Sequence, residues 1–332
     1  MSHLGTDNMS TQDKSCSKIA LVTGGNSGVG YETALGLASA GHKVVIAGRN
    51  EERMTRAMED IRKVLPHANI ESHVLDLGSI GTSLGSANAF LAKYDHLDVL
   101  VLHAGIAIVP FALTPDGYEV QFATNHLGHF AFCTTLLPLL KSSAQRSGDG
   151  RILIVGSRAM RRAEWNYNVT TLPNGSVTEP LTMSGIGSAF GRYGRSKLAN
   201  AIFAYKLDRE CLSSCPSLRV NLLDPGFIAN TGLSQGDGQK FLPSWSKGMV
   251  SALLSASSLV VGQSPKEGAA TTLYLATSPR IKAENQHGMY FNYNGKGRPP
   301  VAKPPNPIAL DQAEQDRLWE FSQECIDRAK KD

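Results

Sequence analysis

The sequence offers little that would mark a disulfide-stabilised, zinc-binding or nucleic-acid-binding protein. Its five cysteines are odd in number and include no CxxC pair, which predicts free thiols in a reducing compartment. We therefore expect no metal site. The net charge of +4 is small for 332 residues, and no block of Lys and Arg occurs. A basic surface is not indicated, so we expect no nucleic-acid partner.

Long hydrophobic runs are also missing. The longest apolar run, Met249 to Gly262, is too short to span a bilayer, so no membrane span is expected. We interpret this run as a helix covering a cleft or the core, with contact to a membrane surface as the alternative. The first 16 residues are polar and match neither a signal peptide nor an anchor. They are predicted to form a flexible tail, 1–16, on a soluble, cytoplasmic protein.

What the chain does contain is a regular alternation of apolar segments and helical patterns. Strands are predicted at residues 18–23, 42–47, 70–77, 98–102, 151–155, 218–223 and 289–293. Helices are predicted at residues 29–40, 51–64, 117–141, 192–211, 265–277 and 310–330. Because the strands are apolar throughout, they indicate a parallel sheet covered by helices on both faces. We therefore predict an α/β fold, a single Rossmann-type, doubly wound sheet of about seven strands in one domain over 17–332.

Two long irregular stretches, 158–190 and 227–264, follow the carboxyl ends of predicted strands. Ligands of doubly wound sheets bind at that edge, so these stretches are predicted to be substrate-binding loops. They are rich in aromatic residues, which favours a bulky, apolar small-molecule substrate. The aromatic residues are Trp165, Tyr167, Phe190, Phe227, Phe241 and Trp245.

A glycine string, TGGNSGVG, joins the first predicted strand to the first helix at Thr23 to Gly30. Such a turn offers backbone N–H groups and a helix N-terminus to a pyrophosphate. Arg49 ends the second strand, where a cation suits the 2′-phosphate of NADP and an acidic residue would suit NAD. We therefore expect NADP(H) to be preferred over NAD(H), with a solvated surface arginine as the alternative.

Tyr193 and Lys197 stand four residues apart, so a helix would place them on one face. An ammonium beside a phenol favours the phenolate and lowers the phenol pKa from about 10 toward neutrality. A tyrosine tuned in this way exchanges protons with a carbonyl or an alcohol. Together with a dinucleotide, the pair indicates hydride-transfer chemistry.

These motifs occur in the order of a known family. TGGNSGVG fits TGxxxGxG, YGRSK fits YxxxK, and NHLGHF, GSRA, SKLAN and DRLWEFS add further matches. The chain resembles the short-chain dehydrogenase/reductase family over residues 17 to 300. Within that family it looks closest to the branch of retinol dehydrogenases, WW-domain oxidoreductases and protochlorophyllide reductases.

The resemblance implies a catalytic tetrad of Asn125, Ser157, Tyr193 and Lys197. Tyr193 would be the general acid or base, and Lys197 would lower its pKa and hold the nicotinamide ribose. Ser157 would hydrogen-bond the substrate oxygen, and Asn125 would support a water that links Lys197 to solvent. The implied cofactor contacts are Thr23, Gly24, Asn26, Ser27, Gly28, Val29, Gly30, Arg49, Asp76, Leu77, Ala104, Gly105, Tyr193, Lys197, Pro225, Gly226, Ile228 and Thr231.

Simpler interpretations remain open for some of these positions. Asn125 could be a buried, satisfied amide, Ser157 a turn or cap residue, and Asp76 a cap of the next helix. The chain also departs from the family at Leu102 to Gly105, where LHAG replaces NNAG. His103 could replace a lost asparagine contact or be an ordinary loop residue. Tyr193 follows Ser157 by 36 positions, so an insertion must bulge over the site.

We predict an NADP(H)-dependent oxidoreductase that interconverts a carbonyl and an alcohol on a bulky, mostly apolar small molecule. A specialised metabolite, a steroid or a retinoid-like compound would suit, and cellular NADPH favours reduction. Redox-neutral isomerisation or cyclisation is the alternative, and a cofactor-sensing protein without turnover is a third. The resemblance also implies a homodimer or homotetramer. The C-terminal helix is expected to cover an edge or a partner.

Overall fold

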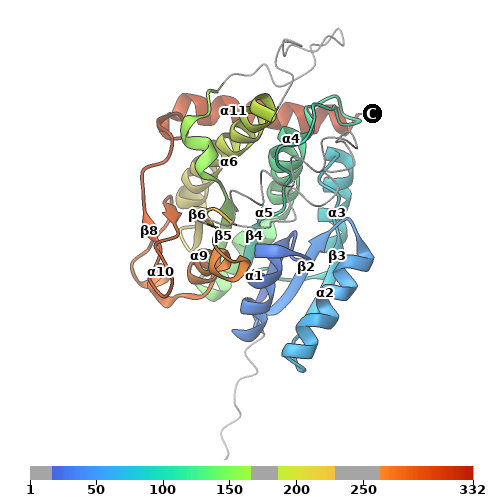
Figure 1. The fold of residues 1–332 in the computed structure, drawn as a ribbon, viewed down its shortest axis with the longest axis vertical. Coiled ribbons are helices and arrows are strands. Elements are labelled where there is room, and N and C mark those ends of the chain that lie inside the picture. Colours follow the sequence, from blue (N-terminus) through green and yellow to red (C-terminus); the bar gives the residue numbers. More distant parts are fainter. Residues whose placement is uncertain (1–16, 166–185, 229–261, 332) are drawn as a thin grey trace, which may run out of the picture.

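The computed structural model describes residues 17–165, 186–228 and 262–331, and Figure 1 shows their arrangement. The described residues form an eight-stranded sheet with the order β3-β2-β1-β4-β5-β6-β7-β8. The pairs from β3 to β7 are parallel, and β8 pairs antiparallel with β7. The strands are β1 (Ile19–Thr23), β2 (Lys43–Gly48), β3 (Ile70–Val74), β4 (Val99–Leu102), β5 (Gly150–Val155), β6 (Leu218–Asp224), β7 (Tyr290–Asn292) and β8 (Val301–Ala302).

Helices cover both faces of this sheet, so the predicted doubly wound α/β fold is confirmed (Figure 1). One hydrophobic core lies between the sheet and α3, α5, α6 and α11, and a second lies between the sheet and α1, α2, α9 and α10. The helices have the bounds α1 (Gly28–Ser39), α2 (Glu51–Val64), α3 (Ile80–Lys93), α4 (Val120–Phe122), α5 (Gly128–Ser147), α6 (Ile186–Ser214), α9 (Pro265–Thr277), α10 (Pro279–Ala283) and α11 (Gln312–Ala329). Shorter helical turns are η1 (Ala123–Leu127, π), η2 (Arg158–Arg162, 3-10) and η4 (Pro307–Leu310, 3-10).

The structure departs from the predicted elements in several places. No helix was predicted between strands three and four, where α3 lies, because the Gly and Ser residues of α3 obscure its apolar stripe of Ile80, Ala87 and Phe90. The third strand ends at Val74 rather than Leu77, since Asp76 Oδ1 accepts from Gly78 N at 2.9 Å and turns the chain out of the sheet. The eighth strand was also missed, because its two residues are both exposed.

The predicted helix 117–141 is in fact three consecutive pieces. It begins as α4, widens into the π-helical turn η1, which contains Asn125, and continues as α5 to Ser147. α6 is longer at both ends than the predicted 192–211. The tail 1–16, most of both predicted binding loops, Thr231 and nearly all of the apolar run 249–262 lie outside the described residues.

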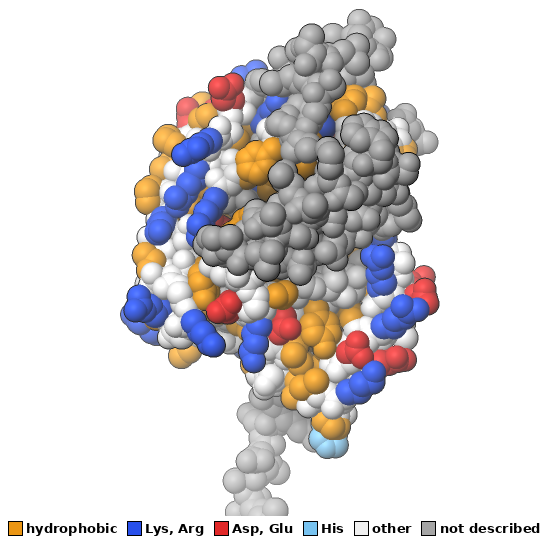
Figure 2. All heavy atoms as spheres, in the orientation of Figure 1, with side chains coloured by type: hydrophobic (Ala, Val, Ile, Leu, Met, Phe, Trp, Pro, Cys, Tyr) orange, Lys and Arg blue, Asp and Glu red, His pale blue; other side chains and the backbone are white. Residues whose placement is uncertain are grey.

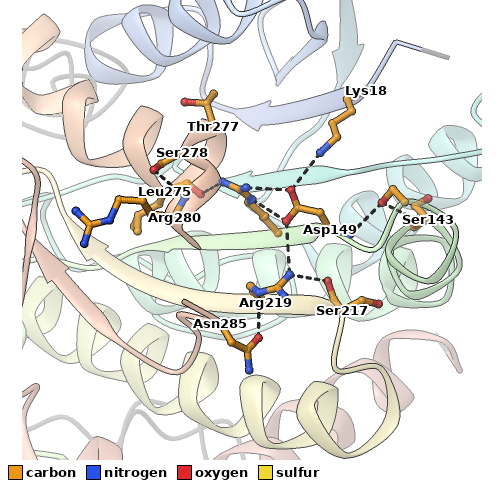
Figure 3. Close-up of polar contacts among 12 residues, drawn as sticks. Lys18, Ser143, Asp149, Ser217, Arg219, Leu275, Thr277, Ser278, Arg280 and Asn285 are labelled. Atoms are coloured by element: carbon orange, nitrogen blue, oxygen red, sulfur yellow. Dashed lines mark hydrogen bonds and ion pairs between the residues drawn. The ribbon is translucent and has the colours of Figure 1, made fainter. Parts of the chain in front are cut away.

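The amino edge of the sheet is closed by a buried charged cluster (Figure 3). Asp149, just before β5, pairs with Arg151 at 2.9 Å and with Lys18 at 3.2 Å. Arg219 of β6 lies 3.5 Å from the same carboxylate and donates to Asn285 Oδ1 at 3.2 Å. This cluster joins β1, β5 and β6 at one edge. Within the described residues, no helix is long and apolar enough to cross a membrane.

Candidate active site

The carboxyl edge of the sheet brings Tyr193 and Lys197 beside the end of β5. Both residues lie on α6, and Lys197 Nζ is 5.9 Å from the centroid of the Tyr193 ring. Lys197 is 4% exposed, and its Nζ donates to Val155 O at 2.9 Å. Ser157 follows β5 in extended backbone, and its Oγ accepts from Ala159 N at 3.2 Å. The structure therefore brings Ser157, Tyr193 and Lys197 together, despite the long interval between Ser157 and Tyr193.

Burial sets the pKa values of this pair. Burial raises the pKa of Tyr193 to about 12, although a hydrogen bond with Ser157 lowers it and the charge of Asp224 raises it further. Burial lowers the pKa of Lys197 to about 8, and Asp224 opposes that change. The net shift of the Tyr193 pKa is thus upward, opposite to the lowering expected from Lys197, because loss of solvation dominates. At neutral pH Tyr193 carries its proton.

Asn125 is a buried amide whose hydrogen bonds are made within the protein. Its Oδ1 accepts from Ile106 N at 2.8 Å, and its Nδ2 donates to Ile106 O and Ser196 Oγ, both at 2.9 Å. These bonds tie the loop after β4 to α6, on which Lys197 lies. The geometry matches the simpler interpretation of Asn125, a satisfied amide, which joins the loop after β4 to α6.

The glycine turn is shaped for close backbone approach. Gly24 has a φ of +70°, and a Cβ on it would lie 3.0 Å from Ala104 Cα. A Cβ on Gly30 would lie 2.2 Å from Gly24 O, so only glycine fits there. Ser27, the N-cap residue of α1, makes no side-chain capping bond, which leaves the first N–H groups of α1 for an anion. This cradle fits the pyrophosphate of a dinucleotide.

Thr23 supports the site from inside the fold rather than facing a ligand. It is fully buried, and its Oγ1 accepts from His103 N and Ala104 N, both at 2.9 Å. The same oxygen lies 2.9 Å from His129 Nε2, while His129 Nδ1 lies 3.0 Å from Asn125 O. His129 thus links the glycine turn to the helix of Asn125. The sequence analysis missed His129, although its spacing of four residues from Asn125 in NHLGHF could have indicated it.

The replacement of NNAG by LHAG preserves the close approach of backbone to the site. A Cβ on Gly105 would lie 2.9 Å from Asn125 Oδ1 and 3.7 Å from Lys197 Nζ. The His103 ring packs over Gly30, and burial and the charge of Lys197 lower the pKa of His103 to about 4. His103 is therefore neutral at physiological pH, and its ring packs against the glycine turn.

The remaining predicted cofactor residues lie around this turn. Arg49 is exposed directly after β2, and a Cβ on Gly48 would lie 3.3 Å from Asn26 Oδ1. Asp76 turns the chain after β3, while Ser79 is the N-cap residue of α3, so Asp76 is not the cap of that helix. Leu77 is buried against Gly128 of α5.

The chain after β6 returns to the start of α1. Gly226 has a φ of +89°, and its N–H donates to Asp224 Oδ1 at 2.9 Å. Beyond Pro225 and Gly226, the side chains of Ile228 and Val29 both pack against Gly268. A Cβ on Gly268 would lie 2.4 Å from Ile228 Cδ1 and 2.9 Å from Val29 Cγ2. Among the described residues, no cluster of His, Cys, Asp and Glu could hold a metal ion.

A parallel sheet with a glycine turn at its first crossover, and a Tyr–Lys pair beside it, defines an oxidoreductase that uses a nicotinamide dinucleotide. Comparison with known proteins agrees with this class. The short chain dehydrogenase family model matches residues 18–169. The chain belongs to the short-chain dehydrogenase/reductase family, whose members act on alcohol and carbonyl groups.

Three relatives illustrate the range of similarity. The chain is 35% identical to the chloroplastic short-chain dehydrogenase TIC 32 B of Brassica napus, covering 93% of this chain and 88% of that protein. It is 31% identical to human retinol dehydrogenase 14, covering 93% and 86%, which confirms the predicted branch. The crystal structure of a single-residue variant of actinorhodin polyketide ketoreductase with NADPH is 22% identical and has the same fold, with a TM-score of 0.60 over 84% of this chain and 96% of that one.

Proposed function

We propose that the protein reduces a carbonyl group on a bulky, mostly apolar small molecule, with NADPH as the hydride donor. The observation that carries this proposal is the pair of Tyr193, which is partly buried, and Lys197, which is buried, beside the glycine turn. The high pKa of Tyr193, about 12, keeps the phenol protonated at neutral pH, as a general acid must be. Carbonyl reduction consumes that proton, so the protonation state fits the reductive direction.

The cofactor would lie across the carboxyl edge. The backbone at Gly24 to Gly30 would hold its pyrophosphate, and Ala104 after β4 and Ile228 after β6 would border its remaining length. When bound, NADPH supplies a hydride to the carbonyl carbon. Every other task falls to side chains of this protein.

Each member of the tetrad has one task in this proposal. Ser157 hydrogen-bonds the carbonyl oxygen and orients it toward Tyr193, which donates its proton as negative charge develops. Lys197, held at Val155 O, supplies a positive charge next to the phenolate that forms. Asn125 fixes the loop after β4 against α6 and so keeps Lys197 in place.

We propose that Arg49 selects NADP(H) over NAD(H) by binding the 2′-phosphate. Arg49→Glu should lower kcat/KM for NADPH by about 10- to 100-fold, which corresponds to the loss of one charged hydrogen bond. The kcat/KM for NADH should fall far less. Steady-state kinetics with both cofactors measures the ratio. Arg56→Glu on exposed α2 is the matched control, and it should leave the ratio unchanged. An unchanged ratio in Arg49→Glu would remove Arg49 from cofactor selection.

The proposed apolar substrate fits the side chains at the carboxyl edge. Phe111, Phe190 and Phe227 are exposed by 40%, 52% and 47% on three different segments that follow strands of the sheet. Several hydrophobic side chains are also exposed on the face drawn in Figure 2. Large exposed aromatics near a catalytic pair favour an apolar ligand. Specialised metabolites, steroids and retinoid-like compounds are the classes we propose to test.

The experiment is NADPH oxidation, followed by absorbance, against a panel of bulky ketones, aldehydes and enones. Wild-type turnover should fall by at least about 100-fold in Tyr193→Phe, the usual contribution of a positioned general acid. Ser157→Ala should also lose kcat, while NADPH binding, measured by fluorescence, should persist in both variants. Tight NADPH binding with no oxidation by wild type would contradict the reductase proposal and support redox-neutral isomerisation or cyclisation. The names of the relatives, which are dehydrogenases, do not favour that alternative.

Two further predictions stay proposals. We place the protein in the cytoplasm, although the Brassica relative is named as chloroplastic, and imaging of a tagged full chain would test this. A homodimer or homotetramer also remains proposed. α11 lies over α5 and α6, with the Trp319 ring 5.0 Å from Phe130 and 6.1 Å from Phe203. Any pairing through these two helices would therefore include α11, and light scattering after size-exclusion chromatography measures the state.

A further inference from the structure

The last residue of β6, Asp224, is a carboxylate buried beside the catalytic pair, and the predicted tetrad did not include it. It is 2% exposed. We propose that Asp224 is a positioning residue that holds Tyr193 and Lys197 in their protonated, proton-donating form and so favours carbonyl reduction. This inference rests on the proposed function and adds an electrostatic control to the same site.

The sheet register places Asp224 at the site. Val155 pairs with Leu223, and Gly156 N donates to Leu223 O at 2.7 Å. Asp224 follows Leu223, so it lies beside Gly156, one residue past Val155 on the neighbouring strand. Because Lys197 Nζ donates to Val155 O, Asp224 lies at the same end of the sheet as Lys197. The position is therefore set by backbone pairing between two central strands and does not depend on a loop.

The carboxylate is held by three donors. Its Oδ1 accepts from Gly226 N at 2.9 Å, and its Oδ2 accepts from Arg158 Nε at 3.2 Å and from the Tyr290 hydroxyl at 3.4 Å. Arg158 has 56% of its side chain exposed, so solvent screens the charge of this pair. Arg158 thus compensates the negative charge of Asp224 from the solvent side.

The titratable and charged groups around Asp224 come from three elements. Tyr193 and Lys197 face it from α6, Arg158 from η2, and Tyr290 from β7, with the Arg161 guanidinium 5.8 Å from the Tyr290 ring centroid. A buried negative charge disfavours a second negative charge on a phenol and favours a positive charge on an amine. Both effects keep a proton on the group concerned. Accordingly Asp224 raises the pKa of Tyr193, adding to burial, and that of Lys197, opposing burial.

Asp224→Asn tests the inference, because asparagine keeps an oxygen for Gly226 N–H and removes the charge. The pH profile of kcat/KM for NADPH-dependent reduction should keep its shape, with its basic limb about one pH unit lower. The profile for oxidation of the product alcohol by NADP⁺ should shift in the same direction. A merely structural role would lower both rates without moving either limb.

Two further variants separate charge from packing. Arg158→Gln removes the compensating cation from an exposed position, so both limbs should move to higher pH, opposite to Asp224→Asn. Tyr290→Phe removes one hydrogen bond but no charge, and both limbs should stay in place. If Asp224→Asn folds poorly, the opposite shift expected in Arg158→Gln still decides the matter. Unmoved limbs in both charge variants would overturn the inference.

A measurement without substrate or cofactor separates this inference from the proposed function. The Lys197 resonance in the full chain with ¹³Cε-labelled lysine, assigned by its loss in Lys197→Arg, should titrate with a midpoint near the pKa of about 8. Asp224→Asn should lower that midpoint by about one pH unit. A shifted midpoint in a protein that turns over no carbonyl would uphold the charge relation and reject the proposed function. An unshifted midpoint in an active reductase would uphold the proposed function and reject the charge relation.

Discussion

At the scale of single residues, loss of solvation rather than mutual attraction sets the pKa values of Tyr193 and Lys197. Tyr193 and Lys197 lie on one helical face, as their spacing predicts, but Lys197 Nζ is directed to Val155 O. Burial moves the two pKa values toward the neutral forms, to about 12 and about 8. The spacing of the two residues could be predicted from the sequence. Their loss of solvation could not, because it depends on which other segments pack over α6.

Gly30 offers a sharp test of the glycine turn. A Cβ there would lie 2.2 Å from Gly24 O, so Gly30→Ala should displace the turn and weaken NADPH binding by at least about tenfold, a change of roughly 1.4 kcal/mol. Fluorescence titration with NADPH measures this. Gly85→Ala in α3 is the control, since a Cβ there meets nothing within 4 Å. It should bind NADPH normally and gain about 0.5–1 kcal/mol of stability. Equal affinity in both variants would contradict the proposed pyrophosphate cradle.

At the scale of elements, Glu71 connects β3 to its neighbours. Lys43 of β2 and Lys93 of α3 each lie 2.7 Å from its carboxylate, and Tyr94 donates to it at 2.7 Å. These bonds, with Lys43 first, lower the pKa of Glu71 from 4.5 to about 2. A carboxylate with a depressed folded pKa adds stability above its unfolded pKa and loses it as pH falls toward the folded value.

Glu71→Gln should therefore cost stability at neutral pH and cost less at each step from pH 4.5 down to about pH 3. Urea unfolding of wild type and variant across this range gives the difference in free energy of unfolding. Glu59→Gln on exposed α2 is the control and should show no such convergence. A difference that stays constant with pH would show that Glu71 contributes through packing rather than charge.

The elements also show what local sequence can and cannot determine. The predicted bounds of α2 and α9 are correct because their start signals are local: Asn50 accepts from Arg53 N, and Ser264 forms a capping box with Glu267. The π-helical turn at Asn125 was not predicted, because the amide that occupies it bonds to Ile106 and Ser196, distant segments of the chain. The hydrogen bonds of Asp224 to Arg158 and Tyr290 were hidden for the same reason.

At the scale of the whole molecule, the carboxyl and amino edges of the sheet differ in what they contain. The carboxyl edge bears the candidate active site, while the amino edge is closed by the buried cluster around Asp149 (Figure 3). A cluster of this kind can stabilise one edge without touching the chemistry at the other. The strands between them are buried on both faces, which keeps the two edges in fixed relation.

Asp149→Asn should therefore destabilise the protein and leave catalysis intact. The substitution leaves the buried guanidinium groups of Arg151 and Arg219 without the Asp149 carboxylate, and breaking a buried ion pair costs about 3–5 kcal/mol. Thermal and urea unfolding measure the loss, and kcat/KM below the new melting temperature should match wild type. A loss of activity in the folded variant would show that the edges are coupled.

Four cysteines distributed through the helical layer give the molecule an internal set of reporters. Cys133 of α5, Cys211 of α6, Cys215 just after α6, and Cys325 of α11 are free and buried. Burial raises the pKa of the Cys211 thiol to about 12 and that of Cys325 to about 11, so neither forms a reactive thiolate while the layer is closed. In a Cys16→Ser background, the rate of thiol labelling at each cysteine would therefore measure how fast α5, α6 and α11 expose that residue to solvent, without any substrate.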